Sequence, residues 1–261
     1  VVLPAGAGRV VSYEEEGWLD APCYIQAMRK LAAAHGAQVF ESPAPLALVA
    51  RSGHVAGVER ADGTRLEADC VVTCAGRWTE ELLAPLDVAI PLVTADRPGS
   101  APLGMLVVTA PHANLPRRIL HGPEVALRPD RGGRVRIHSN SLDRELVPDW
   151  APSPDLPLAR RALELAAGTL PALREVSIER VLAGLRVLPR DGVSIAGWAP
   201  GVEGCYVVAT HSGVTLAAIL GELIASELGG GRPAALLEPF RPARFAGAAV
   251  GMGTAELALD D

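Results

Sequence analysis

The fold is decided by residues 205–227, which have the sequence CYVVATHSGVTLAAILGELIASE. Cys205–Ala209 is a short, uncharged, β-rich run, which is typical of a strand covered on both faces. A tight turn of small residues follows at His211–Gly213, and apolar residues then recur at helical intervals from Val214. Two glutamates interrupt this helix, so it is too short and too charged to span a membrane.

The turn in this stretch predicts a ligand site. A strand that enters a helix through small residues leaves free backbone N–H groups at the helix start, where an anion or an electron-rich ring edge can bind. A second uncharged strand is expected at Asp69–Thr73, and it ends in the small residues Cys74, Ala75 and Gly76. Ligands collect at the carboxyl ends of strands in open α/β sheets. The alternative is an ordinary crossover of an α/β fold.

Composition narrows the class of protein. The 261 residues are 49% hydrophobic and 21% charged, with a net charge of -6, which favours a packed core over disorder. No basic tract indicates nucleic acid, and no signal peptide or membrane span is evident. Cys70 and Cys74 have no histidine near them, so we interpret them as buried strand thiols and predict no metal site. Scattered cysteines favour a reducing cytoplasm.

The remaining pattern predicts a second domain inserted into the first. A helix is expected over Asp20–His35, with Asp20 as its cap, Gly36 at its end and a buried stripe of Ile25, Met28, Leu31 and Ala32. Short strands should follow at 37–41, 46–51, 54–59 and 65–67. From Pro91 prolines and glycines become frequent. Strands are expected at 104–109, 124–127 and 134–138, a helix at 152–167 and an extended segment at 176–188. Together these elements indicate an antiparallel sheet with one helix.

Five motifs together resemble the D-amino-acid oxidase family of flavoproteins, especially its glycine oxidase and sarcosine oxidase-like branch. They are GWLDAPCY at 17–24, VVTCAGRW at 71–78, GLRVLPRDGVSIAG at 184–197, YVVATHSGVTLAAILGELIA at 206–225 and LLEPFRPARF at 236–245. The resemblance implies a mixed α/β fold in which 1–90 and 189–245 form a partial FAD-binding domain. Residues 91–188 would form the substrate domain, and 246–261 a tail.

The resemblance also implies an activity and a site. FAD would oxidise the amine of a small amino acid by hydride transfer, giving an imine, with reoxidation by oxygen or a carrier. Arg186 would bind the substrate carboxylate, and the backbone of Gly213 and Val214 would stabilise charge on the reduced ring. Arg190 is interpreted as a solvated turn residue. The residues expected to contact FAD are Ala75, Gly76, Trp78, His211, Ser212, Gly213, Val214 and Thr215.

Several alternatives remain open for these residues. Arg186 could be a surface arginine on an alternating strand, Trp78 a core residue between domains, and His211 a packing residue of the turn. No cysteine lies within 184–192, where sarcosine oxidase-type relatives attach flavin, so noncovalent binding is expected. Thr210 stands where relatives have glycine.

The main departure from the family pattern is the missing GxGxxG segment, which Gly6-Ala7-Gly8 cannot replace because no strand precedes it. A partner chain or a missing N-terminal segment would then supply the diphosphate site. The alternative function is a noncatalytic or split-subunit relative that needs another chain to bind FAD. A flavin enzyme acting on an opine or a hydroxy acid is a further alternative.

Overall fold

The computed structural model describes residues 10–113 and 118–246, and these fall into two compact units. The first unit takes the described residues of 1–38 and 95–185, and the second those of 39–94 and 186–261. Residues 10–38 contact the first unit: Glu14 pairs with Arg118, Glu16 pairs with His121, and Arg128 donates to the Leu19 carbonyl. The sequence predicts a different division, with residues 1–90 and 189–245 in one domain and 91–188 in the other. The function of each unit stays a prediction.

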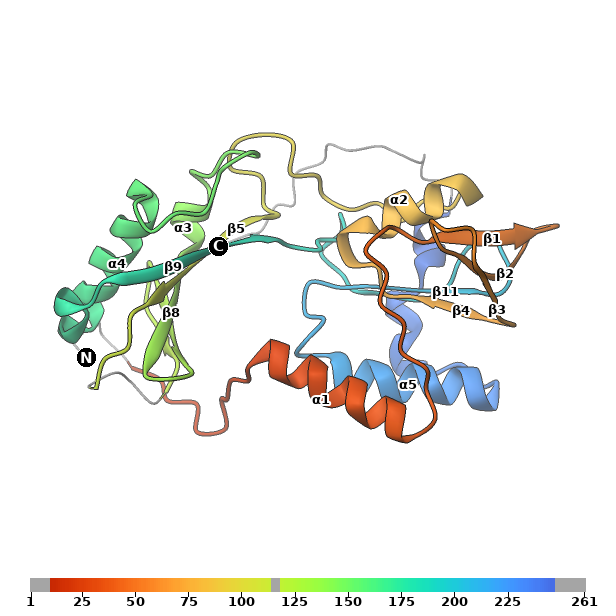
Figure 1. Ribbon diagram of the computed structural model, residues 1–261, viewed down its shortest axis with the longest axis horizontal. Coiled ribbons are helices and arrows are strands. Elements are labelled where there is room, and N and C mark those ends of the chain that lie inside the picture. Colours follow the sequence, from red (N-terminus) through yellow and green to blue (C-terminus); the bar gives the residue numbers. More distant parts are fainter. Residues whose placement is uncertain (1–9, 114–117, 247–261) are drawn as a thin grey trace. The chain divides into compact units, whose positions relative to one another are not determined.

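An antiparallel sheet of five strands, in the order β6-β7-β8-β5-β9, forms the first unit (Figure 1). Its inner face packs on the short helix α3 (Asn140–Asp143) and on α4 (Pro157–Thr169), around a core that includes Leu127, Ile137 and Ala162. The predicted antiparallel sheet with a helix is confirmed. Its strands are β5 (Leu103–Thr109), β6 (Leu120–His121), β7 (Ala126–Asp130), β8 (Arg134–His138) and β9 (Ile178–Leu185).

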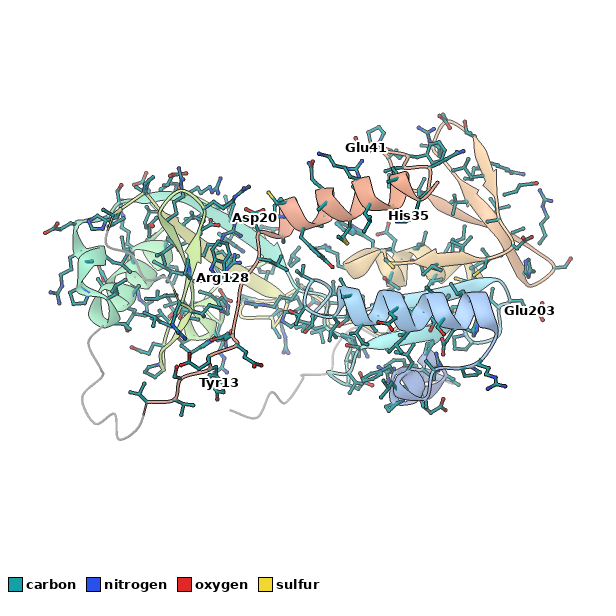
Figure 2. All side chains as sticks on the ribbon, turned by 90° about the horizontal axis from the view of Figure 1, so that it is seen from below. Tyr13, Asp20, His35, Glu41, Arg128 and Glu203 are labelled. Atoms are coloured by element: carbon teal, nitrogen blue, oxygen red, sulfur yellow. The ribbon has the colours of Figure 1, made fainter. Side chains whose placement is uncertain are left out.

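Helix α1 (Ala21–Ala34) begins and ends where the sequence predicts. The Asp20 carboxylate accepts a hydrogen bond from the Cys23 N–H at 2.9 Å, and Gly36 follows the helix with a φ of +92°. Asp20 and His35 mark the two ends of the helix in Figure 2. The predicted buried stripe is wrong, because no residue of α1 is buried. The spacing of apolar residues shows which side of a helix can be covered, but it does not supply the covering surface.

Strand β11 (Cys205–Ala209) is the centre of the second unit. It pairs in parallel with β4 (Val71–Thr73) and antiparallel with β10 (Ile195–Trp198). Helix α5 (Ala217–Gly230) lies on one side of this sheet (Figure 1). The other side carries α2 (Thr79–Leu83) and an antiparallel meander of β1 (Ala47–Arg51), β2 (His54–Glu59) and β3 (Arg65–Glu67).

Both faces of β11 are covered, as its sequence predicts. Cys205, Val207 and Ala209 belong to one apolar cluster, and Tyr206 belongs to another that includes Ile224 of α5. Burial raises the pKa of the Cys205 thiol to about 11. The expectation for the other strand cysteines is wrong in part, because they flank β4 rather than lie within it: Cys70 is half-buried and Cys74 is exposed.

An ion pair between Glu227 and Arg241 connects the segment after α5 to this sheet. Glu227 of α5 accepts hydrogen bonds from the Tyr206 hydroxyl and the Ala234 N–H, each at 2.5 Å, and pairs with the Arg241 guanidinium. Arg241 also donates to the Tyr206 oxygen at 3.2 Å. The pairing with Arg241 lowers the pKa of Glu227 to about 2. Every member is therefore satisfied, which is the condition for a buried charge to be tolerated.

Residues 37–41 do not form the strand that the sequence predicts. No strand of the described residues pairs with them, and a single extended segment without a partner leaves its backbone groups to water. The expectations for Gly6-Ala7-Gly8 and for the tail beyond Ala246 lie outside the described residues.

Candidate active site

Two turns meet at the carboxyl edge of the β4–β11 pair. The register places Val71 opposite Cys205 and Thr73 opposite Val207, and both strands run in the same direction. The segment 74–76 leaves β4, and the segment 210–216 leaves β11, at the same edge. The structure therefore brings together the two turns that the sequence identifies separately, at the position where open α/β sheets bind ligands.

The turn after β11 is longer than predicted. Helix α5 begins at Ala217 rather than Val214, and the turns before it are closed by the Leu216 N–H, which donates to the Ser212 carbonyl at 2.9 Å, and by the Ala217 N–H, which donates to the Val214 carbonyl at 3.3 Å. Within the described part of the chain, the N–H groups of Gly213, Val214 and Thr215 donate no hydrogen bond. All three residues are exposed. Three successive free N–H groups can bind an anion or an electron-rich edge.

Thr210 fixes this turn with its side chain. Its hydroxyl oxygen accepts a hydrogen bond from the Ser212 N–H at 3.1 Å and lies 2.7 Å from the Ser194 hydroxyl. A hydroxyl that bonds the backbone two residues later is a usual means of holding a turn. Thr210 therefore has a structural role in this turn. His211 is exposed.

The turn after β4 requires its glycine. Gly76 has a φ of +60°, a conformation that other residues adopt with strain, and the Thr79 hydroxyl donates to its carbonyl at 2.7 Å. Ala75 precedes it, and the Trp78 N–H donates to the Ala75 carbonyl at 3.2 Å. The Trp78 ring is 61% exposed, with the Arg77 guanidinium 5.4 Å from its centroid. Trp78 is thus not a core residue of its unit.

A third segment lies against the Gly76 turn. A Cβ built on Gly76 would be 3.5 Å from Cγ2 of Val187, the residue next to Arg186. The segment is held further along by a hydrogen bond from the Val93 N–H to the Leu188 carbonyl, at 2.8 Å. Half-buried Arg186 therefore begins a segment that reaches the turn after β4. Its role toward a substrate stays a prediction.

The prediction that Arg190 is a solvated turn residue is wrong in part, because the residue lies in a turn but is half-buried. Its Nε and Nη2 atoms are buried, and neither has a hydrogen-bond partner among the described residues. Its backbone N–H donates to the Pro91 carbonyl at 3.1 Å. Arginine in a turn beside Asp191-Gly192 is typical of a solvated position, so the sequence pattern contained no signal of this burial.

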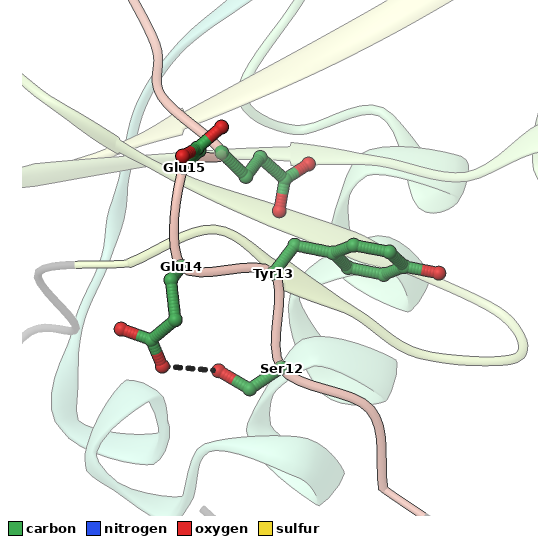
Figure 3. A pocket seen from close by; sticks show the side chains of 5 residues that line it. Ser12, Tyr13, Glu14 and Glu15 are labelled. Carbon is green, nitrogen blue, oxygen red and sulfur yellow. Dashed lines mark hydrogen bonds between the residues drawn. The ribbon is translucent and has the colours of Figure 1, made fainter.

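A hollow on the surface of the first unit is lined by Ser12, Tyr13, Glu14, Glu15 and Glu16 (Figure 3). The Ser12 hydroxyl donates to the Glu14 carboxylate at 3.1 Å. None of the site residues predicted from the sequence lies in it. Its three carboxylates would repel an anionic substrate or a diphosphate, so we do not assign the active site to this hollow.

The described residues lack the features of a metal site and of a membrane-spanning helix. They contain no group of three or more histidine, cysteine, aspartate or glutamate side chains placed to bind a metal ion. Among their helices, none combines the length and the apolar character needed to cross a bilayer.

The chain belongs to a family of flavin enzymes. Residues 3–227 match the model of the DAO family, FAD dependent oxidoreductase. The two-unit fold agrees with this family: glycine oxidase from Geobacillus kaustophilus superimposes with a TM-score of 0.69 at 21% identity, over 86% of this chain and 58% of that one. The chain is therefore a member of the DAO family of FAD dependent oxidoreductases.

Two curated relatives are similar in sequence. The bifunctional protein ThiO/ThiG of Synechocystis is 28% identical over 236 residues, which are 89% of this chain and 34% of that protein. Glycine oxidase of Pseudomonas aeruginosa is 30% identical over 192 residues, which are 72% of this chain and 49% of that enzyme. The chain spans half the length of these relatives or less.

The described residues fit the ring of FAD. The exposed, free N–H groups of Gly213–Thr215 and the buried Nε and Nη2 donors of Arg190 belong to the second unit, and both sets can donate to an electron-rich ring edge. Small residues in both turns let the backbone approach a flat ring closely.

The Gly213 position gives a direct test of this fit. An added Cβ would make only ordinary contacts, at 3.9 Å from Thr210, and φ is not in the left-handed region. We expect Gly213→Ala to keep the melting temperature within about 2 °C, since nothing in the fold is displaced. The methyl group should nonetheless weaken flavin binding about tenfold by holding the ring off the N–H groups. Thermal unfolding and flavin titration measure the two effects, and a variant that binds flavin normally would contradict the assignment.

Proposed function

We propose that the protein oxidises the amine of a small amino acid with noncovalently bound FAD. The observation that carries the proposal is the convergence, in one unit, of two turns at the carboxyl edge of β4 and β11 with the segment that begins at Arg186. The family match and the similarity to glycine oxidases support it. The absence of cysteine from 184–192 supports a noncovalent flavin.

FAD, Arg186 and the turn after β11 would each have a separate role in the oxidation of the amine. Bound FAD would supply the acceptor for a hydride from the substrate α-carbon, while the amine nitrogen would lose a proton and form the C=N bond of an imine, and oxygen or an electron carrier would take up the two electrons. Arg186 would hold the substrate carboxylate by a planar, two-pronged contact that orients the α-carbon. The N–H groups of Gly213 and Val214 would stabilise the negative charge that develops on the ring.

We also propose that the diphosphate of FAD is held by a segment or a chain outside the described residues. Strand β4 has a neighbour on one edge only within the described residues, and Val72 is 39% exposed. A parallel strand is normally buried between neighbours, so this edge fits a further parallel strand. This observation also favours the second candidate, a split-subunit relative that binds FAD only with another chain.

The function can be tested by mixing the flavin-loaded protein with single substrates under anaerobic conditions. Small primary or N-alkyl amino acids should bleach the flavin absorbance near 450 nm in one turnover, because they carry both the oxidisable amine and the carboxylate. Matching 2-hydroxy acids should not. Bleaching by hydroxy acids alone would assign a different substrate class, and no bleaching by any amino acid would favour the noncatalytic candidate.

A further inference from the structure

Arg190 is half-buried, and two of its three guanidinium nitrogen atoms are buried inside its unit. Its Nε and Nη2 atoms have no hydrogen-bond partner within the described residues. Buried polar atoms are paired in the great majority of cases, and a buried charge without a partner is especially costly. Only four side-chain atoms of the described residues share this condition, and three of them belong to Arg190 and Thr73. Thr73 ends β4, directly before the Gly76 turn.

The acid nearest to Arg190 in sequence is already used. The Asp191 carboxylate pairs with both ends of the Arg244 fork, at 2.6 Å from Nε and 3.2 Å from Nη2. A two-pronged pair of this kind occupies both carboxylate oxygens. Asp191 therefore serves Arg244, and the Nε and Nη2 donors of Arg190 are left for another acceptor.

The backbone holds Arg190 beside the candidate flavin site. Its N–H bonds the Pro91 carbonyl, and Val187, three residues earlier, contacts the Gly76 position. Both ends of the segment 187–190 are thus fixed to elements that follow β4. The Nε and Nη2 atoms of this half-buried side chain are buried, so these two donors face the protein rather than water.

We propose that Arg190 binds the electron-rich pyrimidine edge of the flavin ring and stabilises the negative charge that the reduced ring carries. Nε and Nη2 form the side of the guanidinium that offers two parallel donors, which matches the adjacent ring nitrogen N1 and carbonyl oxygen O2 of a flavin. The proposal rests on the proposed function for its cofactor, not for its substrate. It assigns Arg186 to the substrate and Arg190 to the ring.

Sulfite provides a test that needs no turnover. Sulfite adds to the oxidised ring at N5 and leaves negative charge on the pyrimidine edge, and the reaction is followed by the loss of flavin absorbance. In the flavin-loaded protein, Arg190→Met should raise the dissociation constant for sulfite about tenfold or more, because a charge-assisted pair is lost. Arg190→Lys keeps the charge without the fork and should recover part of the effect.

The matched control is Arg60→Met, since Arg60 also has a buried Nε without a partner but lies in the turn after β2. It should change sulfite binding by less than about twofold. If Arg190→Met instead leaves sulfite binding unchanged and raises KM for amino acids, the fork binds the substrate carboxylate and the proposal is wrong. If neither quantity changes in a folded variant, a structural water satisfies Arg190, and the proposal is also wrong. A normal sulfite response in a protein that oxidises no amino acid would reject the proposed substrate while leaving this inference intact.

Discussion

Replacing Arg186 with leucine should lower kcat/KM for small amino acids about 100-fold, mostly through KM. On the proposed assignment, the substitution removes the charge-assisted hydrogen bonds to the substrate carboxylate, which together are worth about 3 kcal/mol, and each 1.4 kcal/mol corresponds to about tenfold. Steady-state kinetics of the flavin-loaded protein measure the effect. The melting temperature should change little, because half-buried Arg186 does not belong to any of the apolar clusters.

Two comparisons make this result specific. Arg180→Leu changes an exposed arginine of β9 and should leave the kinetics within about twofold. An amino-acid amide, which lacks the carboxylate, should react equally slowly with the wild type and with Arg186→Leu. If Arg186→Leu impairs the amide as much as the acid, Arg186 acts on something other than the carboxylate.

Replacing Arg241 with methionine should destabilise the second unit by about 3–5 kcal/mol at pH 7. Glu227 is only 7% exposed, and the substitution removes the positive charge that pairs with its carboxylate. Breaking a buried ion pair by removing one partner is strongly unfavourable. Urea unfolding gives the free-energy change. The control is Arg244→Met, whose ion pair with Asp191 is more exposed and should cost about 1 kcal/mol or less.

The pH dependence gives this prediction a second, independent readout. In the folded wild type the pKa of Glu227 is about 2, below its ordinary value of 4.5. A lowered carboxyl pKa stabilises the fold above the ordinary value, and that stabilisation is lost as pH falls through the folded pKa. The difference between wild type and Arg241→Met should therefore shrink between pH 4.5 and about 2. A difference that stays constant over this range would show that lost packing, not charge, causes the destabilisation.

The elements with strong local signals were predictable from the sequence. Asp20 and Gly36 determined the ends of α1, and the uncharged run at Cys205–Ala209 predicted a strand covered on both faces. The two small-residue turns were recognisable as a candidate ligand site because each follows an uncharged, β-rich run. Their adjacency depends on the parallel pairing of β4 with β11, which the order of residues implies only through the general geometry of α/β sheets.

Three incorrect predictions concern the surroundings of a residue rather than its intrinsic preference for a secondary structure. Segment 37–41 has the composition of a strand but no partner, and the apolar stripe of α1 has no cover within its unit. Arg190 has the sequence context of a solvated turn, yet its Nε and Nη2 atoms are buried. Local pattern reports propensity and periodicity, whereas burial and pairing depend on tertiary contacts.

We propose that the described residues bind the ring of FAD through the turns at 75–78 and 211–215, and that the diphosphate is bound outside them. Titration of the chain with lumiflavin, FAD and ADP, followed by quenching of flavin fluorescence and by calorimetry, tests it most directly. The account predicts similar, weak affinities for lumiflavin and FAD, weakened binding of both in Gly213→Ala, and no detectable binding of ADP. Binding of ADP without lumiflavin, or tight FAD binding that lumiflavin does not share, would contradict it.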